Sequence, residues 1–251
     1  MLDPIADRRV RDQVDEHPHR LVFASLSGAH LYGFPSGDSD VDVRGAHILP
    51  VEDVVGLTDP VETYEAMVVV EGLEVDVVTY DLKKFCTLIL KKNGNVLEQV
   101  VSPLVLRSSA MHEELRDIAL RCLTRHHVHH YRGMTNNRLA AFDEAMQAKP
   151  LLYALRAALT GIHLMRTGEV EPNLTRLIEP YGLPHVAELV ERKVSGEKIT
   201  LDESEAPRWR GEVGRLLVRL EEAFEASTLP EVPQARDELE SLLVRARLED
   251  R

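Results

Sequence analysis

The first eighty residues alternate short apolar runs with turn residues, a pattern typical of β-strands. The run RLVFASL (20–26) is almost wholly apolar, as in a buried strand, and VDVRGAHIL (41–49) begins with strict alternation of acidic and valine side chains. Two further apolar segments, 62–70 and 73–80, flank Glu71-Gly72, and a glycine-containing turn between such segments predicts a β-hairpin. We therefore expect a small sheet here, preceded by a helix over residues 3–17.

From Asp81 onward the apolar positions recur every three or four residues, which is the period of an amphipathic helix. Asp81 is a good N-cap for the segment DLKKFCTLILKK, and Asn95 is expected to cap a second short helix that runs through Glu98. Beyond residue 108 we expect only helices, separated by prolines, at 109–124, 127–147, 151–167, 184–195, 206–226 and 234–248. The sequence thus predicts an α+β protein, with a sheet domain over 1–106 and an all-helical domain over 107–251.

The charge of the chain narrows the classes of partner. The 251 residues carry a formal net charge of −12, which argues against a general nucleic-acid coat protein, because phosphate affinity comes from Lys and Arg. Residues 1–106 hold 18 Asp and Glu against 9 Lys and Arg, whereas residues 107–176 hold 10 Lys and Arg against 7 Asp and Glu. The first segment is suited to divalent cations and the second to an anionic ligand, although scattered surface charge explains the second segment equally well.

The location of the protein is indicated by three features of the sequence. No apolar run approaches the roughly 20 residues of a membrane-spanning helix, and the N-terminal segment lacks the apolar stretch of a secretory signal. Cys86 and Cys122 are too few and too far apart for a disulfide framework or a zinc knuckle. We therefore expect a cytoplasmic protein that does not associate with membranes, and the sequence gives no indication of its oligomeric state.

The segment 27–45 combines a small-residue turn with two closely spaced acids. The strand 20–26 leads into Ser27-Gly28-Ala29, where a short helix is expected to begin, and free backbone N–H groups at such a turn favour an anion such as a phosphate. About ten residues later, Asp40 and Asp42 stand two apart on a strand, so both carboxylates project from the same face. Two converging carboxylates repel each other unless a cation lies between them, and hard oxygen ligands suit Mg²⁺ or Mn²⁺ shared with substrate phosphates.

These residues resemble the nucleotidyltransferase superfamily of DNA polymerase beta, whose signature is a Gly-Ser turn followed by Asp-x-Asp. More narrowly, SGAHLYG (27–33) and SDVDVRG (39–45) are similar to the RNA-repair-pathway polymerase-beta family of nucleotidyltransferases. The resemblance continues through the strand 74–78 and the segment 92–98, and it covers residues 20–170 with decreasing specificity. It implies a small mixed sheet that carries the acids, followed by a helical domain that closes one side of the cleft.

The resemblance also implies a metal-dependent reaction and the acids that support it. Asp40 and Asp42 would bind Mg²⁺ or Mn²⁺ bridging the phosphates of a nucleoside triphosphate. Asp76, on a neighbouring strand, would complete the metal site or take the proton from the attacking hydroxyl. Alternation along that strand also places Glu74 on the same face, so Glu74 is an alternative third acid. A nucleoside monophosphate would pass to an acceptor hydroxyl, with an RNA end as the suggested acceptor.

Further residues are implied as contacts of the nucleotide. Ser27 and Gly28 would form the turn that holds the triphosphate, and Ser39 would contact its terminal phosphate. Arg44 lies on the same face as Asp42 and would hold either a phosphate or Asp76. The helix expected at 151–167 and the residues before it carry the basic and aromatic side chains Lys149, Tyr153 and Arg156, which share one helical face and would bind nucleotide or acceptor, with surface-exposed side chains as the alternative.

The chain departs from the family pattern where the phosphate turn usually reads Gly-Ser. Here the turn reads Gly28-Ala29, so that one phosphate-binding hydroxyl is missing, and His30 follows where Arg is frequent. Backbone amides can still bind phosphate, so we expect weaker affinity for the nucleotide rather than loss of the chemistry. Two other functions remain open: nucleotidyl transfer to a protein or a small molecule, as in modifying antitoxins and antibiotic-modifying enzymes, and nucleotide binding without catalysis.

Overall fold

The computed structural model describes residues 4–196 and 198–249, which form two compact units. The first unit consists of the chain up to Gly28, the segment Asp40–Leu123 and the chain from Val232 onward. The second unit consists of Ala29–Ser39 and Thr124–Glu231. These units do not follow the expected division between residues 106 and 107, because the chain passes from one unit to the other at four places.

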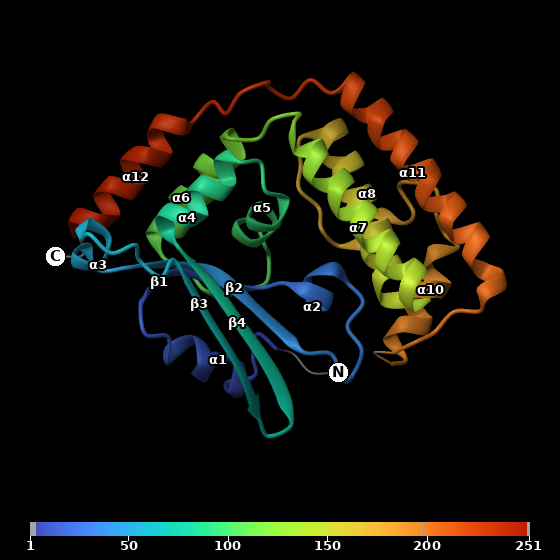
Figure 1. The fold of residues 1–251 in the computed structure, drawn as a ribbon, viewed down its shortest axis with the longest axis horizontal. Coiled ribbons are helices and arrows are strands. Elements are labelled where there is room, and N and C mark those ends of the chain that lie inside the picture. Colours follow the sequence, from blue (N-terminus) through green and yellow to red (C-terminus); the bar gives the residue numbers. More distant parts are fainter. Residues whose placement is uncertain (1–3, 197, 250–251) are drawn as a thin grey trace. The chain divides into compact units, whose positions relative to one another are not determined.

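A mixed sheet with the strand order β3-β4-β2-β1-β5 forms the centre of the first unit (Figure 1). Strands β2 and β4 are parallel, and all other neighbouring strands are antiparallel. The strands are β1 (Arg20–Leu26), β2 (Val41–Ile48), β3 (Thr63–Val70), β4 (Leu73–Asp81) and β5 (Val105–Arg107). The expected α+β fold with a small mixed sheet is therefore confirmed.

The hairpin between β3 and β4 forms where the sequence predicts it. Glu71 and Gly72 connect the two strands, and both have positive φ angles, 48° and 77°. Two consecutive residues of this conformation make the tight turn whose twist matches that of antiparallel strands. Glycine reaches this region without strain, which explains why the turn is placed at Glu71-Gly72.

Helices cover both faces of the sheet. One face packs against α1 (Arg8–Asp15), whose Val10 and Val14 join Val41 and Val43 of β2 in a shared apolar core. The opposite face packs against helices that come from distant parts of the chain (Figure 1). These are α4 (Leu82–Leu90), α5 (Gly94–Val100), α6 (Ala110–Arg121) and α12 (Arg236–Glu249), while α3 (Val51–Val55) follows β2.

Helix α12 is tied to the rest of the first unit by an ion pair with a buried carboxylate. Arg247 donates from Nη2 to both carboxylate oxygens of Asp81, at 2.7 and 2.5 Å, and from Nη1 to the carbonyl of Leu49 at 2.7 Å. Asp81 is only 1% exposed, and its carboxylate also accepts the Lys83 N–H as the N-cap of α4, as the sequence predicts. A single carboxylate therefore connects the end of β4, the start of α4 and α12.

The second unit is helical in the residues described. It contains most of the short helix α2 (Gly28–Tyr32) together with α7 (His127–Ala145), α8 (Ala148–Thr167), α9 (Leu174–Leu177), α10 (Val186–Val194), the 3₁₀ turn Glu203–Glu205 and α11 (Ala206–Ala226). Apolar side chains of α8 are almost entirely buried, consistent with a central position in this unit. Across the described chain, none of the helices combines the length and the apolar character that a bilayer crossing requires.

Some expected boundaries differ from the observed ones. The helix predicted over 3–17 begins only at Arg8, and residue 3 lies outside the described residues. The cap of α5 is Asn93 rather than Asn95, because Lys92 at φ 59° ends the preceding turn and leaves Asn93 extended, with its side chain accepting the next two free N–H groups. The sequence did not predict β5, α3 and α9, which are too short to show a period.

Three histidines gather beside β2 and β4. His47 is fully buried, and its Nδ1 lies 2.8 Å from the hydroxyl of Thr79. The Nε2 of His17 lies 2.9 Å from the same hydroxyl, and the ring of His19 stacks on His47 with the ring centres 4.9 Å apart. Burial lowers the pKa of His47 to about 4, and the neighbouring His19 and His17 act in the same direction.

The buried His47 predicts a loss of stability in mild acid. Between its usual pKa near 6.5 and the value of about 4, the unfolded chain binds a proton that the folded chain excludes. The free energy of unfolding should therefore fall as the pH falls through this window, by at most about 3 kcal/mol for this group. Urea unfolding of the protein and of His47→Asn at several pH values measures this effect. The same pH dependence in both proteins would contradict the assignment.

Candidate active site

The two acids of β2 and β4 stand side by side. Asp42 and Asp76 are Cα partners in the parallel pairing of these strands, so their side chains leave the sheet at the same level and on the same face. The Nη2 of Arg44 donates to Asp42 Oδ1 at 2.5 Å and to Asp76 Oδ2 at 2.7 Å. One cationic nitrogen thus bridges the two carboxylates, and all three side chains are about one fifth exposed.

The alternation of the two strands directs these polar side chains away from α1. The residues between them are valines that pack in the α1 core, namely Val41, Val43, Val75 and Val77. Because successive side chains of a strand point to opposite faces, Asp42, Arg44 and Asp76 must lie on the other face. The same apolar pattern that forms the core therefore fixes the position of the acids.

The turn after β1 lies directly against Asp42. The Ser27 N–H donates to the carbonyl of Asp42 at 2.9 Å. Gly28 has φ 59°, and a Cβ atom at this position would stand 1.8 Å from Asp42 Oδ2. The small-residue turn and the acid, ten or more residues apart in sequence, thus form one local structure that only glycine permits at position 28.

Of the two acids considered on β4, Asp76 and Glu74, it is Asp76 that pairs with Arg44. Arg44 also donates from Nη1 to the carbonyl oxygen of Asp76 at 2.8 Å, whereas Glu74 is exposed. This geometry agrees with the expectation that Arg44 holds Asp76. Asp40 is half-buried and immediately precedes β2. Within the described residues, no group of three or more His, Cys, Asp or Glu side chains is arranged to hold a metal ion.

Ser36 and Ser39 are the buried ends of a turn in the second unit. The Ser39 hydroxyl accepts the Ser36 N–H at 3.0 Å and lies 3.0 Å from the Ser36 hydroxyl. The Nζ of Lys193, on α10, donates to Ser36 Oγ at 2.7 Å and to Ser39 Oγ at 3.3 Å. The Ser39 hydroxyl is therefore part of a hydrogen-bonded network, and Asp40 is the next residue in the chain.

The three residues expected to bind nucleotide from α8 lie in the second unit and differ in environment. Arg156 is 1% exposed, and its guanidinium stands 3.9 Å from the ring centre of Tyr32. Tyr153 makes an edge contact with the same Tyr32 ring and lies below the guanidinium of Arg138. Lys149 is half-buried near the start of the helix. Arg156 is thus a core residue of this unit and not a surface side chain.

Sequence reasoning did not identify Lys193, although the sequence contains a signal for it. The buried positions of α10 are Val186, Leu189, Val190 and Lys193, which follow the spacing of an amphipathic helix. A lysine at a position where the period requires an apolar residue indicates a buried charge with specific partners. Its partners, Ser36 and Ser39, are more than 150 residues away, so the helix alone could not reveal them.

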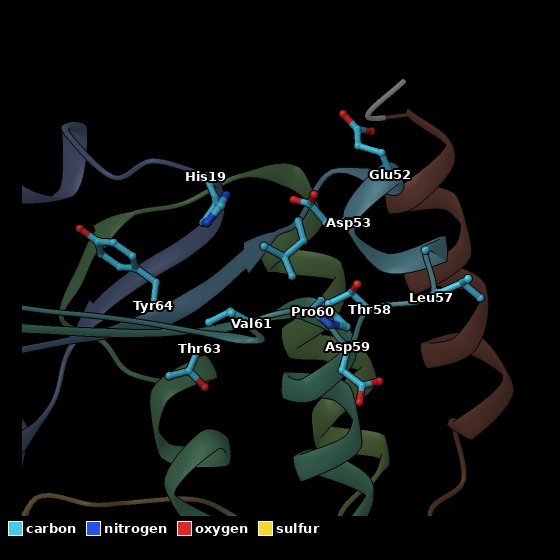
Figure 2. A pocket seen from close by; sticks show the side chains of 12 residues that line it. His19, Glu52, Asp53, Leu57, Thr58, Asp59, Pro60, Val61, Thr63 and Tyr64 are labelled. Atoms are coloured by element: carbon cyan, nitrogen blue, oxygen red, sulfur yellow. The ribbon is translucent and has the colours of Figure 1, made fainter.

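A hollow of about 490 Å³ in the first unit contains none of the expected site residues. It is bordered by the segment 56–61, with Glu52 and Asp53 of α3 on one side and His19 and Tyr64 on the other (Figure 2). Leu57 and Val61 are exposed at this rim. The acids of β2 and β4 are therefore separate from this hollow.

Comparison with known proteins identifies relatives along nearly the whole chain. The model of the RNA repair pathway DNA polymerase beta family (RlaP) matches residues 2–245. The uncharacterized protein MJ0002 of Methanocaldococcus jannaschii is 32% identical over 225 residues, which are 88% of this chain and 91% of that protein. The uncharacterized protein YcgL of Bacillus subtilis is 27% identical over 195 residues, or 73% of each chain. A solved nucleotidyltransferase-like protein from Exiguobacterium sibiricum aligns with 89% of this chain and 74% of its own length, at 15% identity and a TM-score of 0.33.

Proposed function

Since the chain belongs to the RNA repair pathway DNA polymerase beta family, we propose that it is a metal-dependent nucleotidyltransferase that uses an RNA end as its acceptor. In this reaction the acceptor hydroxyl attacks the α-phosphate of a nucleoside triphosphate. A new bond forms between the hydroxyl oxygen and the α-phosphorus, the bond to the β-phosphate oxygen breaks, and pyrophosphate leaves. The family match supports the reaction class, and its link to RNA repair supports the acceptor.

The observation that carries the proposal is the pair formed by Asp42 and Asp76. Asp42 Oδ1 and Asp76 Oδ2 both accept from the same nitrogen of Arg44, at 2.5 and 2.7 Å respectively, so one positive centre can contact both carboxylates. The donor set consists of carboxylate oxygens, which Mg²⁺ and Mn²⁺ prefer. The two carboxylates present therefore fit a divalent cation, which Asp42 and Asp76 would hold. When bound, the metal would neutralise the charge that grows on the phosphates.

The protein residues have separate roles in this proposal. Asp76 accepts the proton of the attacking hydroxyl, because a carboxylate near the reacting oxygen can act as a general base. Arg44 keeps Asp42 and Asp76 together before the substrate binds and is then available to a phosphate oxygen. Contacts with the triphosphate are assigned to Ser27 and Gly28, and to Ser39, which immediately precedes Asp40 in the chain.

Replacing Asp42 by Asn tests the proposed reaction. The protein is incubated with each ribonucleoside triphosphate labelled at the α-phosphate, with Mg²⁺ or Mn²⁺, with and without RNA. We expect label to be transferred to RNA and pyrophosphate to be released. Asp42→Asn should lower the rate by about 1000-fold or more, because a metal contributes several kcal/mol to the stability of the transition state. Asp76→Asn should have a similar effect, and the exposed Glu74→Gln, on the same strand, is the matched control.

The same assay distinguishes the alternative functions. Label on the protein itself or on a small molecule would show that the acceptor is not RNA, while nucleotidyl transfer would remain the reaction class. Nucleotide binding without release of pyrophosphate, unchanged by Asp42→Asn, would indicate a binding module and would overturn the proposal. Equal activity of the Asp76→Asn and Glu74→Gln proteins would remove Asp76 from the site.

A further inference from the structure

Lys193 is a fully buried lysine, with 0% of its surface exposed. It lies on the inner face of α10 beside Val186, Leu189 and Val190. Removing an ammonium group from water costs several kcal/mol unless hydrogen bonds replace its hydration. An apolar residue at this position would avoid that cost, so the contacts that the lysine makes must offset it.

Those contacts close a four-residue turn. Nζ donates to the hydroxyls of Ser36 and Ser39, which are themselves only 7% exposed. Within the turn, the Ser36 N–H donates to Ser39 Oγ at 3.0 Å, and the Ser39 N–H donates to the carbonyl of Ser36 at 3.2 Å. Lys193 thus holds both ends of the turn through their side chains, while the backbone closes it on the other side.

This turn is joined directly to the proposed active site. Ser39 is bonded through its peptide group to Asp40, and β2 with Asp42 begins one residue later. Any displacement of Ser39 therefore moves the backbone from which the Asp40 carboxylate projects. Because Nζ is buried, Lys193 itself does not contact a nucleotide in this conformation.

We propose that Lys193 is a positioning residue for the proposed nucleotidyl transfer. Its buried ammonium fixes the turn 36–39, and the turn fixes both the Ser39 hydroxyl and the start of the Asp40–Asp42 segment. One hydrogen-bonded lysine thereby constrains the backbone at Ser39, from which the chain continues into Asp40. This inference rests on the proposed function for its catalytic consequence, but the state of the turn can be measured without any activity.

The first experiment measures amide hydrogen exchange in the wild-type protein and in Lys193→Met. Methionine keeps the length of the side chain but removes the ammonium, so exchange at the Ser36 and Ser39 amides should accelerate by about tenfold or more, while other α8 and α10 amides keep their rates. The matched control is Arg192→Met. Arg192 is the neighbouring cation on the same helix as Lys193, and the substitution removes its ion pair with Glu205. Unchanged exchange at Ser36 and Ser39 in Lys193→Met would overturn the proposal.

The second experiment measures transfer kinetics. Lys193→Met should lower kcat/KM by about 100-fold, since a displacement of about 1 Å at a reacting centre has an effect of that size. If Lys193 acts through Ser36, the double variant with Ser36→Ala should lose little more activity than Lys193→Met alone. Additive losses would instead indicate independent packing effects and contradict the proposal. Arg192→Met should retain wild-type kinetics.

The outcomes separate this inference from the proposed function. If Asp42→Asn leaves the activity unchanged while Lys193→Met still loosens the turn, the proposed reaction fails and the structural role of Lys193 stands. If Asp42→Asn abolishes transfer and Lys193→Met does not reduce it, the positioning role fails. Should Lys193→Met not fold, Ser36→Ala serves in both experiments, because it removes one partner of the ammonium and leaves Ser39.

Discussion

Substituting alanine for Gly28 is expected to lower nucleotidyl transfer by about 100-fold or more while the protein still folds. The new Cβ would stand 1.8 Å from Asp42 Oδ2, and the backbone at this position has φ 59°. The left-handed conformation costs an alanine about 1–2 kcal/mol. The close contact is relieved only if the Asp42 carboxylate turns away from Arg44, and a displaced carboxylate no longer serves the reaction.

Two measurements together test the Gly28 prediction. Steady-state kinetics report the loss of activity, and thermal unfolding reports that the fold is kept. Gly56→Ala is the matched control in the same unit, because a Cβ there would make only ordinary contacts at 3.6 Å and beyond, so its kinetics should be unchanged. A Gly28→Ala protein with wild-type activity would show that Asp42 tolerates another position.

The largest effect on stability is expected for Arg247→Met. The substitution leaves the Asp81 carboxylate, 1% exposed, without its cation, and an uncompensated buried charge costs about 3–5 kcal/mol. The carbonyl of Leu49 would lose its donor as well. We expect the free energy of unfolding to fall by a corresponding amount, measured by urea denaturation of the whole protein. The contact between α12 and the sheet should weaken at the same time.

The chain provides its own control for this prediction on the same helix. Arg245 pairs with Glu114 of α6, but both side chains are 45% exposed, so Arg245→Met should cost no more than about 1 kcal/mol. Adding Asp81→Asn to Arg247→Met should recover part of the lost stability, because the buried charge is then removed. Equal costs for the two single arginine variants would contradict the role assigned to Asp81.

Local sequence patterns predicted much of the fold because the decisive interactions are local. The period-2 alternation located β2, the Glu71-Gly72 pair located the hairpin, and Asp81 was correctly identified as a helix cap. The same reasoning missed β5, which exists only through its pairing with β1. It also grouped α12 with the preceding helices, because nothing near residue 247 in the sequence indicates a partner at residue 81.

In the site, too, features set by neighbouring residues could be predicted, whereas contacts between residues far apart in sequence could not. The alternation of acids and valines predicted that Asp42 stands on a strand and that Asp76 stands on a neighbouring strand, and the structure pairs the two residues in register. The alternation could not choose between Asp76 and Glu74, and the structure shows that Asp76 contacts Arg44 while Glu74 is exposed. Lys193 was missed because its two hydroxyl partners lie on a loop more than 150 residues earlier.

The link between Asp81 and Arg247 has a consequence for the order of events during protein synthesis. The two residues are 166 positions apart, so at 5–20 residues per second the ribosome makes the arginine roughly 10–30 s after the aspartate. Throughout that interval the nascent sheet has neither its buried counter-charge nor the apolar side chains of α12. Completion of the acid-bearing unit must therefore wait for the synthesis of the helical unit inserted within it, so the helical unit is complete in sequence first.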